Sequence, residues 1–292
     1  MKKYLVSITI FLGFLLLVTP VNSHAEKIKV IASIVPLADL VKQVGGERVD
    51  VRVLLPPGAN PHIYEPTPKA IKDISDARLF IKIGAGLEFW LEKIIKASGN
   101  NRLIIVNSSS GIPLIKETHF HGSSVADPHI WLDPVIVIDI VKKIENALVE
   151  IDHPNSDLYK RRASLYKEKL LQLDKEISER TKKFKIKEYV TFHPAWNYFS
   201  KRYGLKVVGV IEESPGKEPS PKHIERIIKE IKRIGSRVIF VEPQFNPKIA
   251  EAIAKESGSQ VLYLDPIGGQ KGRETYLNIM RYNVSVMESV MR

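Results

Sequence analysis

Three histidines and one aspartate stand beside prolines in short segments of otherwise different sequence. They are His62 in Pro61-His62, His129 in Asp127-Pro128-His129, His193 in Phe192-His193-Pro194, and Asp265 in Leu264-Asp265-Pro266. A proline fixes its own φ and restricts the residue before it, so such turns leave their side chains little freedom. Imidazole nitrogens and carboxylate oxygens are ligand atoms of Zn²⁺ in proteins. The hypothesis is that these four side chains converge on one metal ion.

The elements that must position these residues begin with four apolar segments in the first half of the chain. We expect buried strands at 27–34, 49–55, 77–84 and 101–107. Helical patterns alternate with them, one after Pro36, one begun by Thr67-Pro68, one over 87–97 and one over 133–150. This alternation predicts a right-handed parallel α/β domain over residues 26–155.

A long charged segment follows, and then the alternation begins again. Apolar residues lie close to the spacing of one helix face at Leu158, Leu165, Leu170, Leu173 and Ile177. We therefore expect one stiff linking helix over 156–184. Four more strands, at 188–193, 205–211, 237–242 and 260–265, predict a second α/β domain over 185–292, which ends in a helix from about Arg273. The predicted fold class is α/β, with two parallel four-stranded domains joined by one long helix.

Each candidate ligand follows a predicted strand at its carboxyl end, which is the edge where open parallel sheets bind ligands. His62 and His129 come from the first domain, whereas His193 and Asp265 come from the second. Two domains that face each other would bring the four together in the cleft between them. Taken singly, His62 is typical of a surface turn, His193 of a buried core histidine and Asp265 of a turn or helix cap; the common placement at strand ends favours the site.

The composition of this set indicates which metal it would hold. Three imidazoles and one carboxylate suit tetrahedral Zn²⁺, and the absence of cysteine excludes thiolate sites. Ca²⁺ and Mg²⁺ prefer oxygen ligands. Mn²⁺ or Fe²⁺ would fit better with two carboxylates, so His193 in place of an acid favours zinc and leaves manganese as the alternative.

Several other polar and aromatic residues lie near the candidate site. His119 and His121 form a small cluster that is either an auxiliary metal-collecting loop or an ordinary exposed loop. We expect Trp131 and Trp196 to pack against the ligand loops and fix them. Four glutamates could approach the strand ends but are more simply caps or salt-bridge partners: Glu65, Glu212, Glu213 and Glu242.

The N-terminus and the charge balance bear on location and partners. Lys2 and Lys3, a short apolar run and the small residues Ser23 and Ala25 predict a secretory signal peptide over 1–25. Its removal would lower the formal charge from +11 to +9. The remaining basic residues alternate with acidic ones on helices, which argues against a nucleic-acid partner. With no cysteine to accept a lipid, we expect a periplasmic protein that is not lipidated. We also expect a monomer.

In its motifs the chain resembles the metal-binding receptors of zinc and manganese ABC importers. The matching segments occur in the family's order over nearly the whole mature chain: Gly58-Ala59-Asn60-Pro61-His62 with Glu65-Pro66-Thr67-Pro68, Asp127-Pro128-His129-Ile130-Trp131-Leu132-Asp133-Pro134, Thr191-Phe192-His193-Pro194-Ala195-Trp196, Glu213-Ser214-Pro215 with Glu218-Pro219-Ser220, and Leu264-Asp265-Pro266. The resemblance implies two α/β domains bridged by a long helix, with His62, His129, His193 and Asp265 as the metal ligands. A histidine at the third ligand position is similar to the zinc branch, whereas the long histidine-rich loop of many zinc receptors is reduced here to His119 and His121.

These observations predict an extracytoplasmic receptor that captures Zn²⁺ and passes it to an ABC permease in the inner membrane. Four protein ligands would leave no open position for catalysis, so we expect no enzymatic activity. The alternatives are a manganese or iron receptor on the same fold and a zinc-dependent hydrolase. Against the hydrolase, the chain has no His-Glu-x-x-His motif.

Overall fold

The computed structural model describes residues 26–118, 124–214 and 216–292. The predicted signal segment at 1–25 and the pair His119 and His121 lie outside these ranges. Among the helices of the described residues, none combines the length and the apolar character needed to cross a bilayer.

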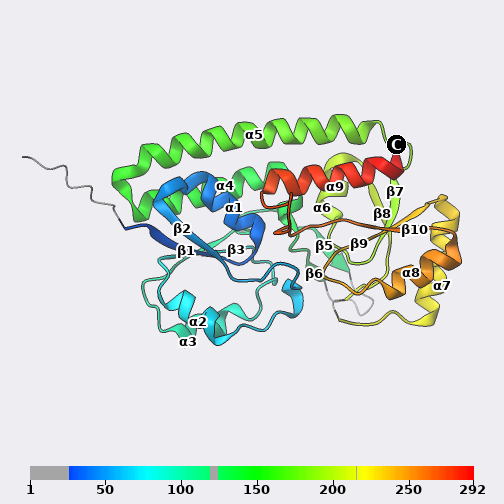
Figure 1. The fold of residues 1–292 in the computed structure, drawn as a ribbon, viewed down its shortest axis with the longest axis horizontal. Coiled ribbons are helices and arrows are strands. Elements are labelled where there is room, and N and C mark those ends of the chain that lie inside the picture. Colours follow the sequence, from blue (N-terminus) through cyan, green and yellow to red (C-terminus); the bar gives the residue numbers. More distant parts are fainter. Residues whose placement is uncertain (1–25, 119–123, 215) are drawn as a thin grey trace, which may run out of the picture.

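The first half of the chain forms a parallel sheet with the strand order β2-β1-β3-β4. The strands are β1 (Ile28–Ala32), β2 (Val49–Val53), β3 (Leu79–Lys82) and β4 (Ile104–Asn107). Val30 of the central strand β1 stands opposite Val51 on one side and Leu79 on the other. Val30 and Leu79 are fully buried, because helices cover both faces of this sheet (Figure 1).

The helices of the first half begin where the sequence provides a cap or a proline. They are α1 (Val35–Gly45), α2 (Pro68–Ser75), α3 (Leu91–Ser98) and α4 (Pro134–Ile151), with single 3-10 turns η1 (Gly46–Arg48) and η4 (His153–Asn155). Thr67 caps α2, since its side-chain oxygen accepts a hydrogen bond from the amide of Ala70. Asp133 caps α4 in the same way, by accepting from the amide of Val135 at 2.8 Å.

The second half repeats this architecture in a parallel sheet with the order β10-β9-β7-β8. The strands of this sheet are β7 (Glu188–Thr191), β8 (Lys206–Val210), β9 (Val238–Val241) and β10 (Gln260–Tyr263). The helices of the second half are α6 (Asn197–Tyr203), α7 (Pro221–Ile234), α8 (Lys248–Ser257) and α9 (Tyr276–Met291). The predicted fold class, two four-stranded parallel α/β units joined by one long helix, is confirmed.

The long helix α5 (Ser156–Lys182) runs along both halves of the molecule, outside α4 and α9 (Figure 1). It packs against α1 and α4 of the first half and against α6 and α9 of the second. One detail of the prediction was wrong, because Leu165 is 53% exposed and Tyr166 is buried in its place. The buried side chains are one helical stripe, spaced four and three residues apart: Tyr159, Ala163, Tyr166, Leu170, Leu173 and Ile177.

A small antiparallel ribbon was not predicted. It pairs β5 (Lys116–Thr118) with β6 (Ser124–Ala126) and leads directly into Asp127. Strands of three residues are too short to show an alternating apolar pattern.

The fifth predicted strand, over 188–193, ends earlier than expected, at Thr191. The hydroxyl of Thr191 donates to the carbonyl of His193, and the chain turns there.

The last helix, α9, returns to the first half of the molecule. It packs against α5 and α1, and the amide of Tyr276 donates to the buried carboxylate of Asp39 at 2.8 Å. A single apolar core therefore includes residues from both halves, such as Val30, Leu173 and Met287.

Candidate metal centre

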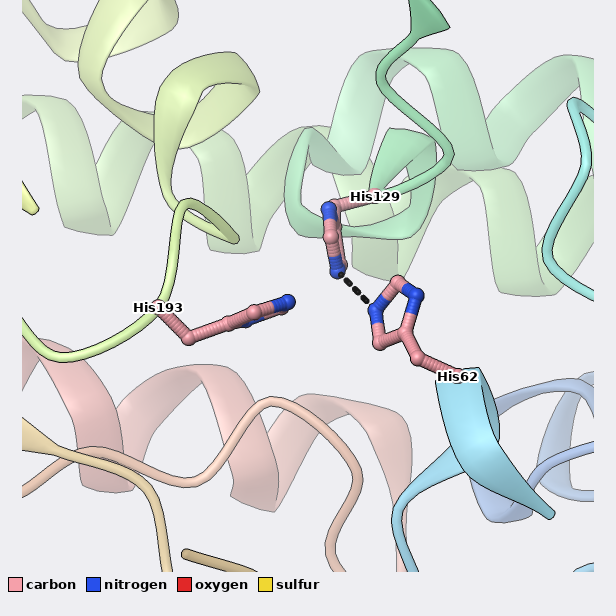
Figure 2. A group of neighbouring side chains, drawn as sticks. All are labelled: His62, His129 and His193. Atoms are coloured by element: carbon pink, nitrogen blue, oxygen red, sulfur yellow. Dashed lines mark hydrogen bonds between the residues drawn. The ribbon is translucent and has the colours of Figure 1, made fainter. Parts of the chain in front are cut away.

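The side chains of His62, His129 and His193 point toward one another from three separate segments (Figure 2). One ring nitrogen from each lies within 4.8 Å of the other two. The Nε2 atoms of His62 and His129 are 3.2 Å apart. Two nitrogens bound to zinc at tetrahedral angles are about 3.3 Å apart when each bond is about 2.0 Å. The pair already has the spacing of two ligands on one ion.

His62 is presented by a short turn whose conformation is set by its neighbours. It lies in the 3-10 turn η2 (Pro61–Ile63), which follows β2. The side chain of Asn60 caps this turn by accepting from the amide of His62 at 2.9 Å, and Pro61 fixes the first position of the turn. The next residue, Ile63, is 58% exposed, so the turn stands at the surface while the imidazole of His62 points inward.

His129 is held from behind by Asp127. One carboxylate oxygen, Oδ1, lies 2.7 Å from His129 Nδ1 and also accepts from the backbone amide of His129 at 2.9 Å. Both side chains are almost completely buried. A carboxylate at Nδ1 keeps the proton on that nitrogen and directs the Nε2 lone pair to the other side of the ring. That side faces His62.

His193 is completely buried and is supported less closely. Its Nδ1 lies 4.0 Å from Oε1 of Glu242 and has no hydrogen-bond partner among the described residues. Glu242 also accepts from the indole nitrogen of Trp196 at 3.1 Å. Burial raises the pKa of Glu242 to about 8, although the Trp196 hydrogen bond acts in the opposite direction. A mainly protonated carboxyl group therefore lies next to this imidazole near neutral pH.

Burial also affects the imidazoles themselves. It lowers the pKa of His62 to about 3, with a smaller contribution from His129. Burial likewise places the pKa of His193 well below its ordinary value, and the other two histidines add to the effect. Neutral imidazoles have the free lone pairs that a metal needs. His62 and His193 can therefore bind a cation near neutral pH without first losing a proton.

Asp265 occupies the predicted strand end but is not a member of the three-histidine group. Its Oδ1 accepts from the amides of Ile267 and Gly268, and its Oδ2 forms an ion pair with Arg273 at 3.1 Å. It is 2% exposed and follows β10 by two residues. The structure thus brings together three of the four predicted residues, and Asp265 is paired with an arginine.

Both predicted tryptophans are buried beside the ligand loops. The ring centroid of Trp131 lies 5.2 Å from that of His129, and its indole nitrogen donates to the carbonyl of Pro266 at 2.8 Å. This hydrogen bond connects the His129 segment, including η3 (Ile130–Leu132), with the Asp265 segment. The sequence reasoning missed the role of Asp127, although an acidic residue two positions before His129 was a usable signal. It treated Glu242 as a cap or salt-bridge residue, and the structure places it against His193.

Comparisons with known proteins agree with this geometry. Residues 30–290 match the family described as zinc-uptake complex component A, periplasmic. The chain is 33% identical to the high-affinity zinc uptake system protein ZnuA of Bacillus subtilis over 282 residues, covering 91% of this chain and 88% of that protein. It is 30% identical to the manganese-binding lipoprotein MntA of Halalkalibacterium halodurans, covering 93% and 91% of the two chains. A crystal structure of a zinc-bound ZnuA deletion mutant is similar with a TM-score of 0.83 at 30% identity, covering 91% of this chain and 98% of that one.

Proposed function

Because the chain belongs to the family of periplasmic zinc-uptake components of ABC importers, we propose that His62, His129, His193 and Asp265 together bind Zn²⁺. The protein is a zinc-binding solute-binding protein and not an enzyme. Zinc is its cargo, which distinguishes this site from a catalytic centre in which a metal stays. The single observation that supports the site best is the convergence of three buried or half-buried imidazoles from three loops.

Asp265 is proposed as the fourth ligand because the carbonyl of the next residue, Pro266, is hydrogen-bonded to Trp131 in the His129 segment, and because Asp265 has a suitable oxygen. The backbone of its own loop uses Oδ1, whereas Oδ2 is buried and has no hydrogen-bond partner among the described residues. This oxygen would bind the metal while Arg273 remains beside it. Three nitrogens and one oxygen would complete the tetrahedral set of Zn²⁺.

We propose that residues 26–155 and 185–292 act as the two domains of the receptor and that 156–184 connects them. The packing of α5 on helices of both halves supports a restricted hinge. The segment 1–25 would serve as the export signal. The sequence of 292 residues contains no cysteine, which supports a protein without a lipid anchor, unlike the relative named as a lipoprotein. The loaded, monomeric receptor would then pass its zinc to the permease of the importer.

Zinc titration of single variants tests the ligand set. Alanine in place of His62, His129, His193 or Asp265 should each weaken Zn²⁺ binding by orders of magnitude in competition with a chelator, because each change removes one of the four proposed ligand atoms. His153, an exposed histidine in η4, provides the matched control, and His153→Ala should bind zinc as the unmodified protein does. Unchanged affinity in any of the four would remove that residue from the set.

Manganese is the second candidate cargo, since one relative is a manganese-binding protein. Competition between Zn²⁺ and Mn²⁺ at neutral pH decides between them. The three imidazoles favour zinc, because Mn²⁺ prefers a larger share of oxygen ligands. Tighter binding of Mn²⁺ than of Zn²⁺ would show that the proposed cargo is wrong while leaving the site itself in place.

A further inference from the structure

The loop that carries Asp265 is built so that only one carboxylate oxygen remains for a ligand. The buried side chain of Asn283, on α9, accepts from the Asp265 amide and donates to the Asp265 carbonyl, each at 2.7 Å. Oδ1 of Asp265 accepts from the amide of Gly268 at 2.8 Å. Gly268 has a φ of +75°, and a Cβ there would lie 2.4 Å from Cδ1 of Ile279, so this amide can approach only because the residue is glycine.

The remaining oxygen, Oδ2, is in contact with Arg273. Nη1 of the guanidinium lies 3.1 Å from it, and the two side chains are 14% and 3% exposed. The contact does not have hydrogen-bond geometry, so it is mainly electrostatic. An arginine is always charged, and Oδ2 therefore lies permanently beside a positive charge.

Arg273 does not depend on Asp265 for its position. Its guanidinium lies over the ring of Tyr282, 4.5 Å from the centroid, which is a cation–π contact. It also donates to the side chain of Gln270, while its backbone amide donates to the Gln270 carbonyl at 2.8 Å. These contacts hold the charge in place whichever way the Asp265 carboxylate turns.

We propose that Arg273 sets the zinc affinity of the site by keeping a fixed positive charge on the one Asp265 oxygen that is left for the metal. Two cations that share a carboxylate oxygen repel each other, most strongly where little water screens them. The arginine thus weakens the hold on zinc and speeds its release, which a receptor needs in order to deliver cargo. The inference rests on the proposed function, since it requires Asp265 to be a ligand.

Replacement of Arg273 by glutamine tests this inference in two properties that should change in opposite directions. Arg273→Gln should bind Zn²⁺ about tenfold more tightly and release it more slowly to a chelator, an effect of the size that residues next to metal ligands commonly have. The metal-free protein should melt at a lower temperature, because the buried carboxylate of Asp265 loses its partner. Arg273→Lys retains the charge and should remain near the affinity of the unmodified protein.

Two controls separate this inference from the ligand assignment. Arg281→Gln removes the same charge from α9, where Arg281 pairs with Glu176 at 2.9 Å, and should leave zinc affinity unchanged. Asp265→Asn should weaken zinc binding and make the further change Arg273→Gln almost silent. If Arg273→Gln weakens zinc binding, the arginine positions the ligand and the inference is wrong. If Arg273→Gln has no effect on zinc binding while Asp265→Asn weakens it, the role given to Arg273 is wrong and the ligand set stands. If neither change has an effect, Asp265 is not a ligand, and the proposed ligand set is wrong as well.

Discussion

Replacing Asp127 by asparagine should weaken zinc binding by about 10- to 100-fold while all three histidines remain in place. The magnitude follows from the contact that is lost. Oδ1 of Asp127 lies 2.7 Å from His129 Nδ1, and the two side chains are 0% and 5% exposed. A buried hydrogen bond to a charged group contributes about 1.5–3 kcal/mol, and about 1.4 kcal/mol corresponds to a tenfold change in affinity.

Asparagine cannot reproduce the contacts of the carboxylate. Oδ1 accepts from the amide and Nδ1 of His129, and Oδ2 accepts from the side-chain nitrogen of Asn197 at 3.1 Å. All of these partners donate when His129 carries its proton on Nδ1. An amide has one accepting oxygen and one donating nitrogen, so in either orientation its NH₂ group faces a donor. His129 should therefore lose its fixed ring orientation.

The assay is a chelator competition titration of the two proteins, with a melting curve of each metal-free protein to confirm that it is folded. Asp133→Asn is the matched control: it removes the same charge four residues beyond His129, and asparagine also caps helices well, so α4 should be retained. Zinc affinity within twofold of the unmodified protein in Asp127→Asn would refute the argument that this carboxylate orients the ligand.

Three other perturbations have defined outcomes. In the unfolded chain His62 binds a proton below its ordinary pKa of 6.5, whereas in the folded metal-free protein it does so only near pH 3. The free energy of unfolding should therefore fall as the pH falls from 6.5 toward 3. Chemical denaturation at several pH values measures this dependence, and His62→Gln should reduce its slope. The folded protein holds a proton on Glu242 up to about pH 8, whereas the unfolded chain releases it near pH 4.5. The free energy of unfolding should therefore fall as the pH rises between these values. Glu242→Gln should remove that fall, and an unaltered pH profile would contradict a raised pKa of Glu242. Zinc at about 1,000 times its Kd should stabilise the protein against unfolding by about 4 kcal/mol, and a chelator should reverse the rise in melting temperature; no shift would contradict specific binding to the folded state.

The parts of the fold that could be predicted are those with a repeating local pattern. The eight strands of the two sheets are apolar runs closed by glycine, proline or a ligand segment, and each appeared within a few residues of its predicted place. The cap Thr67 and the first-turn proline Pro68 could be predicted as well, because they act within one helical turn. Parallel sheets with predicted ligands at their carboxyl ends then define where a site can form.

What could not be predicted depends on contacts between distant segments. The buried face of α5 was placed one residue away in its first half, since leucines and tyrosines compete for burial and only the packing against α1 and α4 decides between them. The pairing of Asp265 with Arg273 is equally hidden. They are eight positions apart, and nothing in Asp265-Pro266 shows that the loop returns to place a guanidinium on the carboxylate.

Hydrogen bonds between distant segments link one of the proposed ligands of the first half, His129, to the second half. His129 comes from the first half by sequence, yet its segment is tied to the second half by the hydrogen bonds from Trp131 to the Pro266 carbonyl and from Tyr276 to the Trp131 carbonyl, both 2.8 Å. Asn197 adds a third link through Asp127. By contrast, the hydrogen bond that shapes the His62 turn is local, from its own amide to Asn60. A relative motion of the halves that leaves these hydrogen bonds intact would move His129 together with the Pro266 segment and change the distance from His129 to His62.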